Sequence, residues 1–273
     1  MTSKDQPVSE LLARIRVLFT GGGRLWAMLG GLVLLTYNTW LFWEPMNGHV
    51  AIFNGYLSEF SASDQPHNFF FRGGDLATAV IVIPMGIAAL WRWPASYRHR
   101  PRWHALSAIM LALFGVSTFF DAFFSMDCSP SLSQACRVAE AAGKLSTIHS
   151  AHDFTSVGAQ VGICGSMIAM CVAMFRSSVD GALRVAMITI TAVESGALVI
   201  MMAMLVLGAP GLGYPQAVMV AVASIWFCVV GWRLAAPPSA EVQAVLASKV
   251  AAETSPEPST SAPTASDGQT RGR

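Results

Sequence analysis

Charge is scarce in this chain. Charged residues make up 12% of its 273 residues, about half of the share that is typical of soluble domains. The 17 Lys and Arg residues nearly balance the 16 Asp and Glu residues, which leaves a formal net charge of +1. This small excess does not indicate nucleic-acid binding, because the basic residues flank apolar segments. We therefore expect no nucleic-acid partner, and a soluble domain is disfavoured.

Cysteine is also sparse, with five residues in the chain. Cys164, Cys171 and Cys228 lie inside apolar stretches, where cysteine usually acts as a small hydrophobic side chain. The spacing of the five residues excludes a zinc site made of four cysteines.

Apolar residues, in contrast, are abundant at 53% of the chain. A helix needs roughly 20 apolar residues to span a bilayer. A soluble protein can bury one or two such runs, but this chain contains six. We therefore predict an all-α, polytopic membrane protein with a bundle of six transmembrane helices. The six segments lie at about 25–43, 74–91, 104–124, 154–175, 185–207 and 216–232.

The basic residues predict how these helices cross the membrane. They gather on alternate sides of the six segments, and the other side holds only Arg72, Arg137 and Lys144. By the positive-inside rule, both termini are cytoplasmic in a plasma-membrane protein, and the loops 44–73, 125–153 and 208–215 face outward. Trp residues at the helix ends are expected to act as anchors at the membrane interface.

Three regions follow from this pattern. Residues 1–24 form a cytoplasmic or interfacial segment, which lacks the pattern of a cleavable signal and contains an amphipathic stretch at 9–19. Residues 25–234 form the transmembrane domain. Residues 235–273 form a cytoplasmic tail, which we expect to be mostly disordered because its last part is rich in Ser, Thr, Pro and Ala.

Cys128 and Cys136 both fall in the second outward loop. An oxidising exterior would allow them to pair and to stabilise the loop by roughly 2–4 kcal/mol. The alternative is two free thiols. We expect the disulfide.

Two histidines enter the membrane near this loop. His149, His152 and Ser156 are spaced i, i+3, i+7, so they share one face of the fourth helix. Histidines at a helix end can be simple polar anchors. Next to intramembrane acids, they can also bind a metal ion or act in catalysis.

Asp121 lies about one turn from the outer end of the third helix, with Ser125 expected above it at i+4 and Asp127 in the loop. A charge at this depth costs several kcal/mol unless it is paired or lies in a wet cavity. The histidine face of the next helix offers the nearest partner, because helices joined by a short loop are usually neighbours.

Further ionisable residues are expected at the same outer level. Glu59 and His67 fall in the first outward loop, and Asp75 is expected to begin the second helix. Asp75 could serve there as a helix cap. Glu194 lies near the middle of the fifth helix, where it is either protonated, paired or lining a cavity. We group these four residues as candidate pocket residues.

The motifs YLSEF…DQPHNFFFRGGD, FDAFFSMDCSPS and LSTIHSAHDFTS resemble the domain-of-unknown-function 998 family of bacterial, mainly actinobacterial, membrane proteins. The third-helix motif of that family reads closer to D-x-x-F-P-M-D-C, so Ser125 stands where Pro is usual. The resemblance covers residues 25–234 and implies a multi-span helical bundle without implying a reaction. The matching residues are Asp121, Met126, Asp127, Cys128, Cys136, His149 and His152.

The first functional hypothesis is a hydrolase that acts on lipid or envelope substrates. His149, His152 and Asp121 or Asp127 could bind zinc, which would acidify a water molecule for attack. Ser156 or Ser125 would orient the substrate. In a version without metal, a His–Asp pair would act as the general base.

The second hypothesis is a small transporter, or an accessory or sensor subunit of a cell-envelope complex. Its acids and histidines would bind protons, an ion, a small molecule or a lipid head group. Glu194 at mid-depth favours this hypothesis, because transport pathways place ionisable groups there. A purely structural scaffold is the third alternative.

Overall fold

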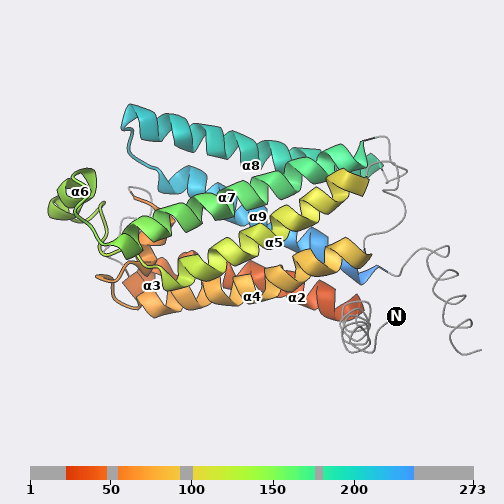
Figure 1. Ribbon diagram of the computed structural model, residues 1–273, viewed down its shortest axis with the longest axis horizontal. Helices are drawn as coiled ribbons and strands as arrows, with labels where there is room; N and C mark the ends of the chain where they lie inside the picture. The colour runs from red at the N-terminus through yellow and green to blue at the C-terminus, as the bar shows by residue number, and fades with distance from the viewer. Residues whose placement is uncertain (1–22, 48–54, 93–100, 176–180, 237–273) are drawn as a thin grey trace, which may run out of the picture. The chain divides into compact units, whose positions relative to one another are not determined.

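The computed structural model describes residues 23–47, 55–92, 101–175 and 181–236. The regular elements in these ranges are all helices (Figure 1), as predicted. The amphipathic stretch 9–19 and the tail from 237 onward lie outside the described residues. The elements are α2 (Gly23–Thr36), η1 (Thr39–Phe42), α3 (Trp43–Asn47), η2 (Leu57–Ser61), α4 (Asn68–Arg92), α5 (Pro101–Phe123), α6 (Gln134–Ala141), α7 (Thr147–Met174), α8 (Gly181–Leu207) and α9 (Gly213–Ala235).

Six helical stretches in the described ranges are long and apolar enough to cross a membrane. The chain is therefore a multi-pass membrane protein, and the predicted number of spans is confirmed. The stretches are Gly23–Phe42, Asn68–Leu90, Arg102–Phe123, Thr147–Met174, Gly181–Leu207 and Gly213–Ala235.

Two helices begin six or seven residues before their apolar runs. The second span starts at Asn68 rather than 74, and the fourth starts at Thr147 rather than 154. In the fourth, Ser146 caps the helix by accepting a hydrogen bond from the backbone N–H of His149. Capping lets polar residues form the first turns of a helix, so hydropathy alone places its start too late.

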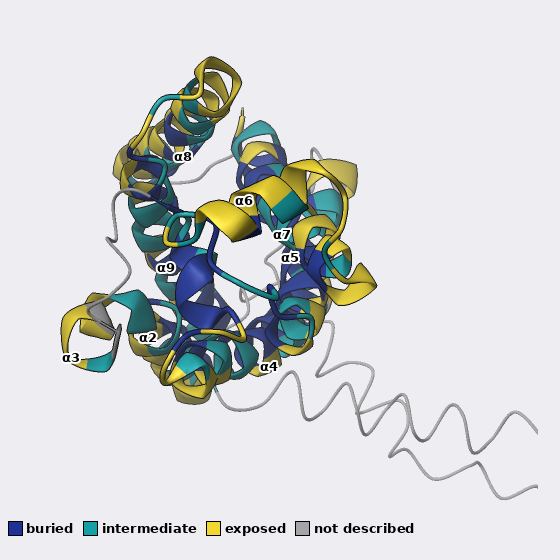
Figure 2. Cartoon of the chain, turned by 90° about the vertical axis from the view of Figure 1, so that its left-hand side faces the viewer, coloured by how far each residue is buried: buried dark blue, intermediate teal, exposed yellow. Residues whose placement is uncertain are grey.

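The six spanning helices form a closed ring (Figure 2). Helix α2 contacts both α4 and α9, α5 lies between α4 and α7, and α8 joins α7 to α9. Neighbours in sequence are thus neighbours in space, and the contact between α2 and α9 closes the ring.

Small residues bring the first and last helices of the ring together. A Cβ atom added to Gly231 on α9 would lie 2.5 Å from the carbonyl oxygen of Trp26 on α2. No side chain fits at that distance, so glycine is required for this crossing.

Helix α8 is the least covered member of the ring. Only 11% of its most apolar stretch is buried by the rest of the protein, against 50% for α4 and for α9. Its buried residues are Met187, Glu194 and Ala197. A carboxyl group is therefore among the few groups that α8 turns inward.

The segments 55–67 and 124–146 pack together at one end of the bundle, which we call the capped end. Helix α6 lies there, on the left of Figure 1. Cys128 and Cys136 form a disulfide in this cap, as predicted. Leu57 and Phe60 of the cap pack with Phe71 of α4 in a small apolar cluster, which attaches the cap to the bundle.

Candidate functional site

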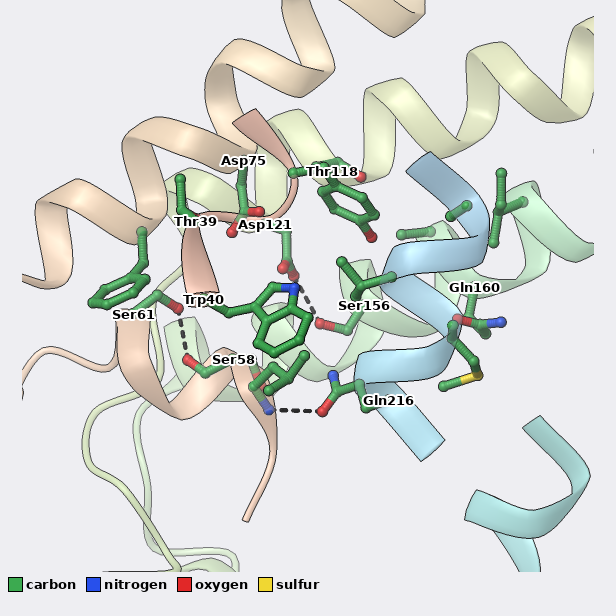
Figure 3. Close-up of a pocket in the computed structure, with 18 of the residues that line it drawn as sticks. Thr39, Trp40, Ser58, Ser61, Asp75, Thr118, Asp121, Ser156, Gln160 and Gln216 are labelled. Carbon is green, nitrogen blue, oxygen red and sulfur yellow. Dashed lines mark hydrogen bonds between the residues drawn. The ribbon is translucent and has the colours of Figure 1, made fainter. Parts of the chain in front are cut away.

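A cavity of about 120 Å³ lies between the helices below the cap (Figure 3). This volume has room for several water molecules. Three carboxyl groups line it, from Asp75 on α4, Asp121 on α5 and Glu194 on α8. Three separate helices therefore direct acidic side chains toward one intramembrane space.

Asp121 has the partners that the sequence predicted on the next helix. Its Oδ1 accepts hydrogen bonds from the hydroxyls of Thr155 at 2.6 Å and Ser156 at 3.0 Å, and it lies 3.2 Å from His152 Nδ1. Thr155 was not among the predicted site residues. Its position next to Ser156 and three residues after His152 could have indicated it.

His152 is held by two acceptors at once. Its Nδ1 lies 2.8 Å from the carbonyl oxygen of Phe124 as well as close to Asp121. Because both neighbours accept hydrogen bonds, Nδ1 carries the proton. The Nε2 atom is buried and has no hydrogen-bond partner among the described residues. The ring thus ties α7 to the chain just beyond the end of α5.

His149 belongs to a different group of contacts. Its Nδ1 accepts a hydrogen bond of 3.2 Å from the backbone N–H of Asp127, and its Nε2 lies 3.7 Å from Glu140. The Asp127 carboxylate accepts from the backbone N–H of Ser146 at 2.7 Å and from its hydroxyl at 2.6 Å. These hydrogen bonds from Ser146 hold the pKa of Asp127 below its usual range.

The four residues predicted to bind zinc therefore lie in two separate groups. His152 is with Asp121, and His149 is with Asp127. The Nδ1 lone pair of His149 is already used by a backbone N–H. Within the ranges that the structure describes, no three His, Cys, Asp or Glu side chains are grouped so as to hold a metal ion. These residues do not fit a zinc centre.

Two other predicted site residues build the cap. Helix α5 ends at Phe123, so Ser125 does not stand above Asp121, and its hydroxyl lies 2.8 Å from that of Ser63. Glu59 is buried. Its Oε2 accepts a 3.0 Å hydrogen bond from the backbone N–H of Ser131. Neither residue lines the cavity.

His67 is exposed in the turn before α4 and has a positive φ of 55°. It is not among the cavity-lining residues. Asp75 lies about two turns inside α4, which begins at Asn68. It therefore does not begin the second helix and does not cap it. Its carboxyl group points into the cavity (Figure 3) and has no hydrogen-bond partner in the described part of the chain.

Glu194 lies at the midpoint of α8 and is 1% exposed. Its Oε1 accepts a 2.9 Å hydrogen bond from Gln160 Nε2 on α7. Its Oε2 is buried and finds no donor among the described residues. Glu194 therefore lines the cavity with one of its two carboxyl oxygens hydrogen-bonded.

No Lys, Arg or His side chain is among the described residues that line this cavity. Amide, hydroxyl and aromatic groups line the cavity with the acids. Among the described residues, only Asp121 of the three acids lies close to a histidine, His152, which does not line the cavity. Buried carboxylates without a positive partner are costly in a medium of low dielectric constant. The cavity therefore favours an occupant that carries positive charge, or protons on its acids.

Residues from the first and last spans complete the wall, and sequence reasoning missed them. Trp40 lines the cavity, and its Nε1–H donates to Asn38 Oδ1 at 3.2 Å. Gln216 also lines it and accepts from the backbone N–H of Leu57 at 2.7 Å. The polar residues Asn38 and Gln216 at the ends of apolar runs were the available signal.

A family model described as "Protein of unknown function (DUF998)" matches residues 28–233. The chain belongs to this family. The match confirms the resemblance seen in the motifs and contains every residue that lines the cavity. No curated protein and no solved structure matches the chain. The DUF998 description carries no activity, so function has to be argued from the cavity.

Proposed function

We propose that this protein binds a small cation in the cavity between its helices, as a small transporter or as a sensor subunit in the plasma membrane. One observation carries the proposal. The Oε2 atom of Glu194 is buried without a donor in the described ranges and belongs to a residue that lines the cavity. Asp75 lines the same space and also has no hydrogen-bond partner there.

The physical basis is the shortage of positive charge. An isolated carboxylate at membrane depth costs several kcal/mol, and the hydroxyls of Thr155 and Ser156 offset that cost only for Asp121. A cation that enters the cavity satisfies the remaining carboxylates. It therefore stabilises the folded protein, by an amount that rises with the ratio of the cation concentration to its Kd.

We place the capped end, and with it the cavity beneath the cap, toward the outer side of the membrane. Two observations support this orientation. The segments that form the cap hold only Arg137 and Lys144 of the chain's 17 Lys and Arg residues, and a disulfide is favoured in an oxidising compartment. The cation would then be taken from outside the cell.

The experiment uses the full-length protein in lipid nanodiscs and follows its thermal unfolding with Na⁺, Mg²⁺ or choline chloride. At a concentration of 100 times the Kd, a bound cation adds about 2.7 kcal/mol of stability. We expect at least one of these cations to raise the Tm, and Glu194→Gln and Asp75→Asn to suppress that rise.

The matched control is Asp153→Asn, which removes an exposed carboxyl group of α7 that does not line the cavity. It should leave the cation-dependent rise in Tm unchanged. A protein that responds to none of the three cations would overturn the proposal. So would a response that Glu194→Gln and Asp75→Asn both leave intact.

A second candidate, hydrolysis of a lipid or envelope ester, is favoured by the contacts of Asp121. This carboxylate orients His152 through Nδ1 and also binds the hydroxyl of Ser156, which lines the cavity. His152 itself is not among the lining residues, so the geometry supports this function less well. Turnover of short-chain p-nitrophenyl esters that His152→Ala and Ser156→Ala both abolish would establish it. Turnover in both variants equal to that of the original protein would exclude it.

A further inference from the structure

Aromatic and aliphatic side chains line the cavity together with the acids. Tyr37, Trp40, Phe71, Met219 and Val220 all contribute to this lining. Such a mixed lining is typical of sites for small organic ligands, in which few polar groups set the orientation and apolar groups cover the rest.

The acids themselves are distributed differently from metal ligands. They come from α4, α5 and α8, and no three acidic, His or Cys side chains in the described ranges converge on one point. A bare divalent ion needs several oxygen ligands at about 2.0–2.6 Å. A larger cation can instead interact with carboxylates spread around it.

The ring of Trp40 is held at this site. Its Nε1–H is bonded to Asn38, and Asn38 in turn donates to Ser224 Oγ on α9 at 2.8 Å. Figure 3 shows the Trp40 indole at the same cavity as Asp75, Asp121 and Ser156. Trp is the side chain that attracts cations most strongly through its ring face.

From these observations we infer that the cation is an organic ammonium ion, recognised by the indole of Trp40 together with the carboxyl groups of Asp75 and Glu194. The inference rests on the proposed function and names its ligand class. The carboxyl groups supply the charge, and the aromatic wall covers the alkyl groups of the ligand. A hydrated inorganic ion would leave that wall in contact with water.

The test measures binding by calorimetry on the full-length protein in nanodiscs. The probes are choline, n-butylammonium and 3,3-dimethylbutan-1-ol, which keeps the shape of choline without its charge. We expect at least one of the two ammonium ions to bind, and the uncharged alcohol to bind at least tenfold more weakly than choline or not at all, because it cannot interact with the carboxylates.

Two variants of Trp40 distinguish the contribution of an aromatic face to binding from that of an apolar side chain. Trp40→Phe and Trp40→Leu both lose the hydrogen bond to Asn38, but only Phe keeps an aromatic face. We expect Trp40→Leu to weaken the binding of the ammonium ion roughly tenfold, and Trp40→Phe to weaken it less. Equal affinities of the two variants for the ammonium ion would show that the aromatic ring of residue 40 does not contribute to its recognition.

The outcomes distinguish this inference from the proposed function. If Na⁺ or Mg²⁺ binds in a manner that depends on Glu194 and neither ammonium ion binds, the ligand class is wrong while the cation site stands. If the uncharged alcohol binds as tightly as choline, the ligand class is likewise wrong. If no cation of either kind binds, the proposed function fails and the inference fails with it.

Discussion

The side-chain amide of Gln160 on α7 donates a 2.9 Å hydrogen bond to the carboxyl group of Glu194 on α8. Both residues lie near the middle of their helices. Because most of α8 is uncovered by the rest of the protein, this bond is one of few polar links between α8 and the ring.

We expect Gln160→Leu to lower the free energy of unfolding by about 1–3 kcal/mol, because it leaves the carboxyl group of the buried Glu194 without its amide donor. Thermal unfolding in nanodiscs measures the change. Gln134→Leu, at an exposed position of α6, is the control and should be close to neutral. If both variants have the unfolding temperature of the original protein, the hydrogen bond between Gln160 and Glu194 does not contribute to stability.

Gly231→Ala should destabilise the protein by roughly 1–3 kcal/mol. The new Cβ would lie 2.5 Å from the carbonyl oxygen of Trp26, so α2 and α9 must move apart. Gly31→Ala is the matched control, because a Cβ there meets nothing within 4 Å and alanine favours the helix. Equal unfolding temperatures of Gly231→Ala and Gly31→Ala would contradict the close approach of α2 and α9.

Stability should depend on the ionisation of Asp127. The hydrogen bonds of Ser146 lower the pKa of this carboxyl group in the folded state. The ionised carboxylate therefore adds to the stability of the folded protein at pH values above the ordinary Asp pKa of about 3.9. It is lost as the pH falls through the lower, folded-state pKa. Asp127→Asn should therefore unfold at a lower temperature than the original protein at pH 7, and the two should converge below about pH 4.

The companion variant for this measurement is Ser146→Ala, which removes the hydroxyl donor and keeps the backbone N–H donor. Its unfolding temperature at pH 7 should fall between those of Asp127→Asn and the original protein. A constant difference between Asp127→Asn and the original protein from pH 3 to pH 7 would show that Asp127 does not act through its charge.

Removal of the disulfide should loosen the cap. Cys128 and Cys136 are separated by 8 positions, and for so short a loop chain entropy gives about 2–3 kcal/mol of stabilisation. Cys128→Ser with Cys136→Ser should lower the unfolding temperature, and a reducing agent should lower that of the original protein and leave the double variant unchanged. The buried Cys164→Ser serves as the control for the loss of a thiol; its unfolding temperature should still fall when the reducing agent is added.

The orientation of the protein across the membrane can be determined with reporter fusions. We expect a reporter inserted at Ser131, in the cap, to be active outside the cell, and one placed after Ala236 to be active inside. The physical reason is that the cap segments hold only Arg137 and Lys144 of the 17 Lys and Arg residues, whereas cytoplasmic segments are enriched in basic residues. Activities on the reverse sides would place the capped end on the cytoplasmic side of the membrane.

Several features of the site could be predicted from local spacing. The i, i+3, i+7 pattern correctly placed His149 and His152 on one buried face of α7, and Asp121 meets that face through His152 and Ser156. The pattern could not separate the roles of the two histidines. One turn along the helix moves His149 from the Asp121 group to the backbone of the cap.

Other predictions failed where the backbone departs from a regular helix. Ser125 was expected above Asp121 only on the assumption that α5 continues, but the helix ends at Phe123. Glu59 lies in the short 3-10 helix η2 and His67 in a turn, and the course of such short segments depends on tertiary contacts. The buried packing of Leu57 and Phe60 against Phe71 turns Glu59 toward the cap.

The sequence by itself determined the class of this protein, because six long apolar runs can bury their backbone polar groups in a bilayer only as helices. It also determined the disulfide, through two cysteines in one short loop. Only the tertiary structure decided that Asp75, Asp121 and Glu194 share a cavity with Trp40. Their helices are distant in sequence, and the order and rotation of helices around a ring depend on side-chain packing, which hydropathy does not encode.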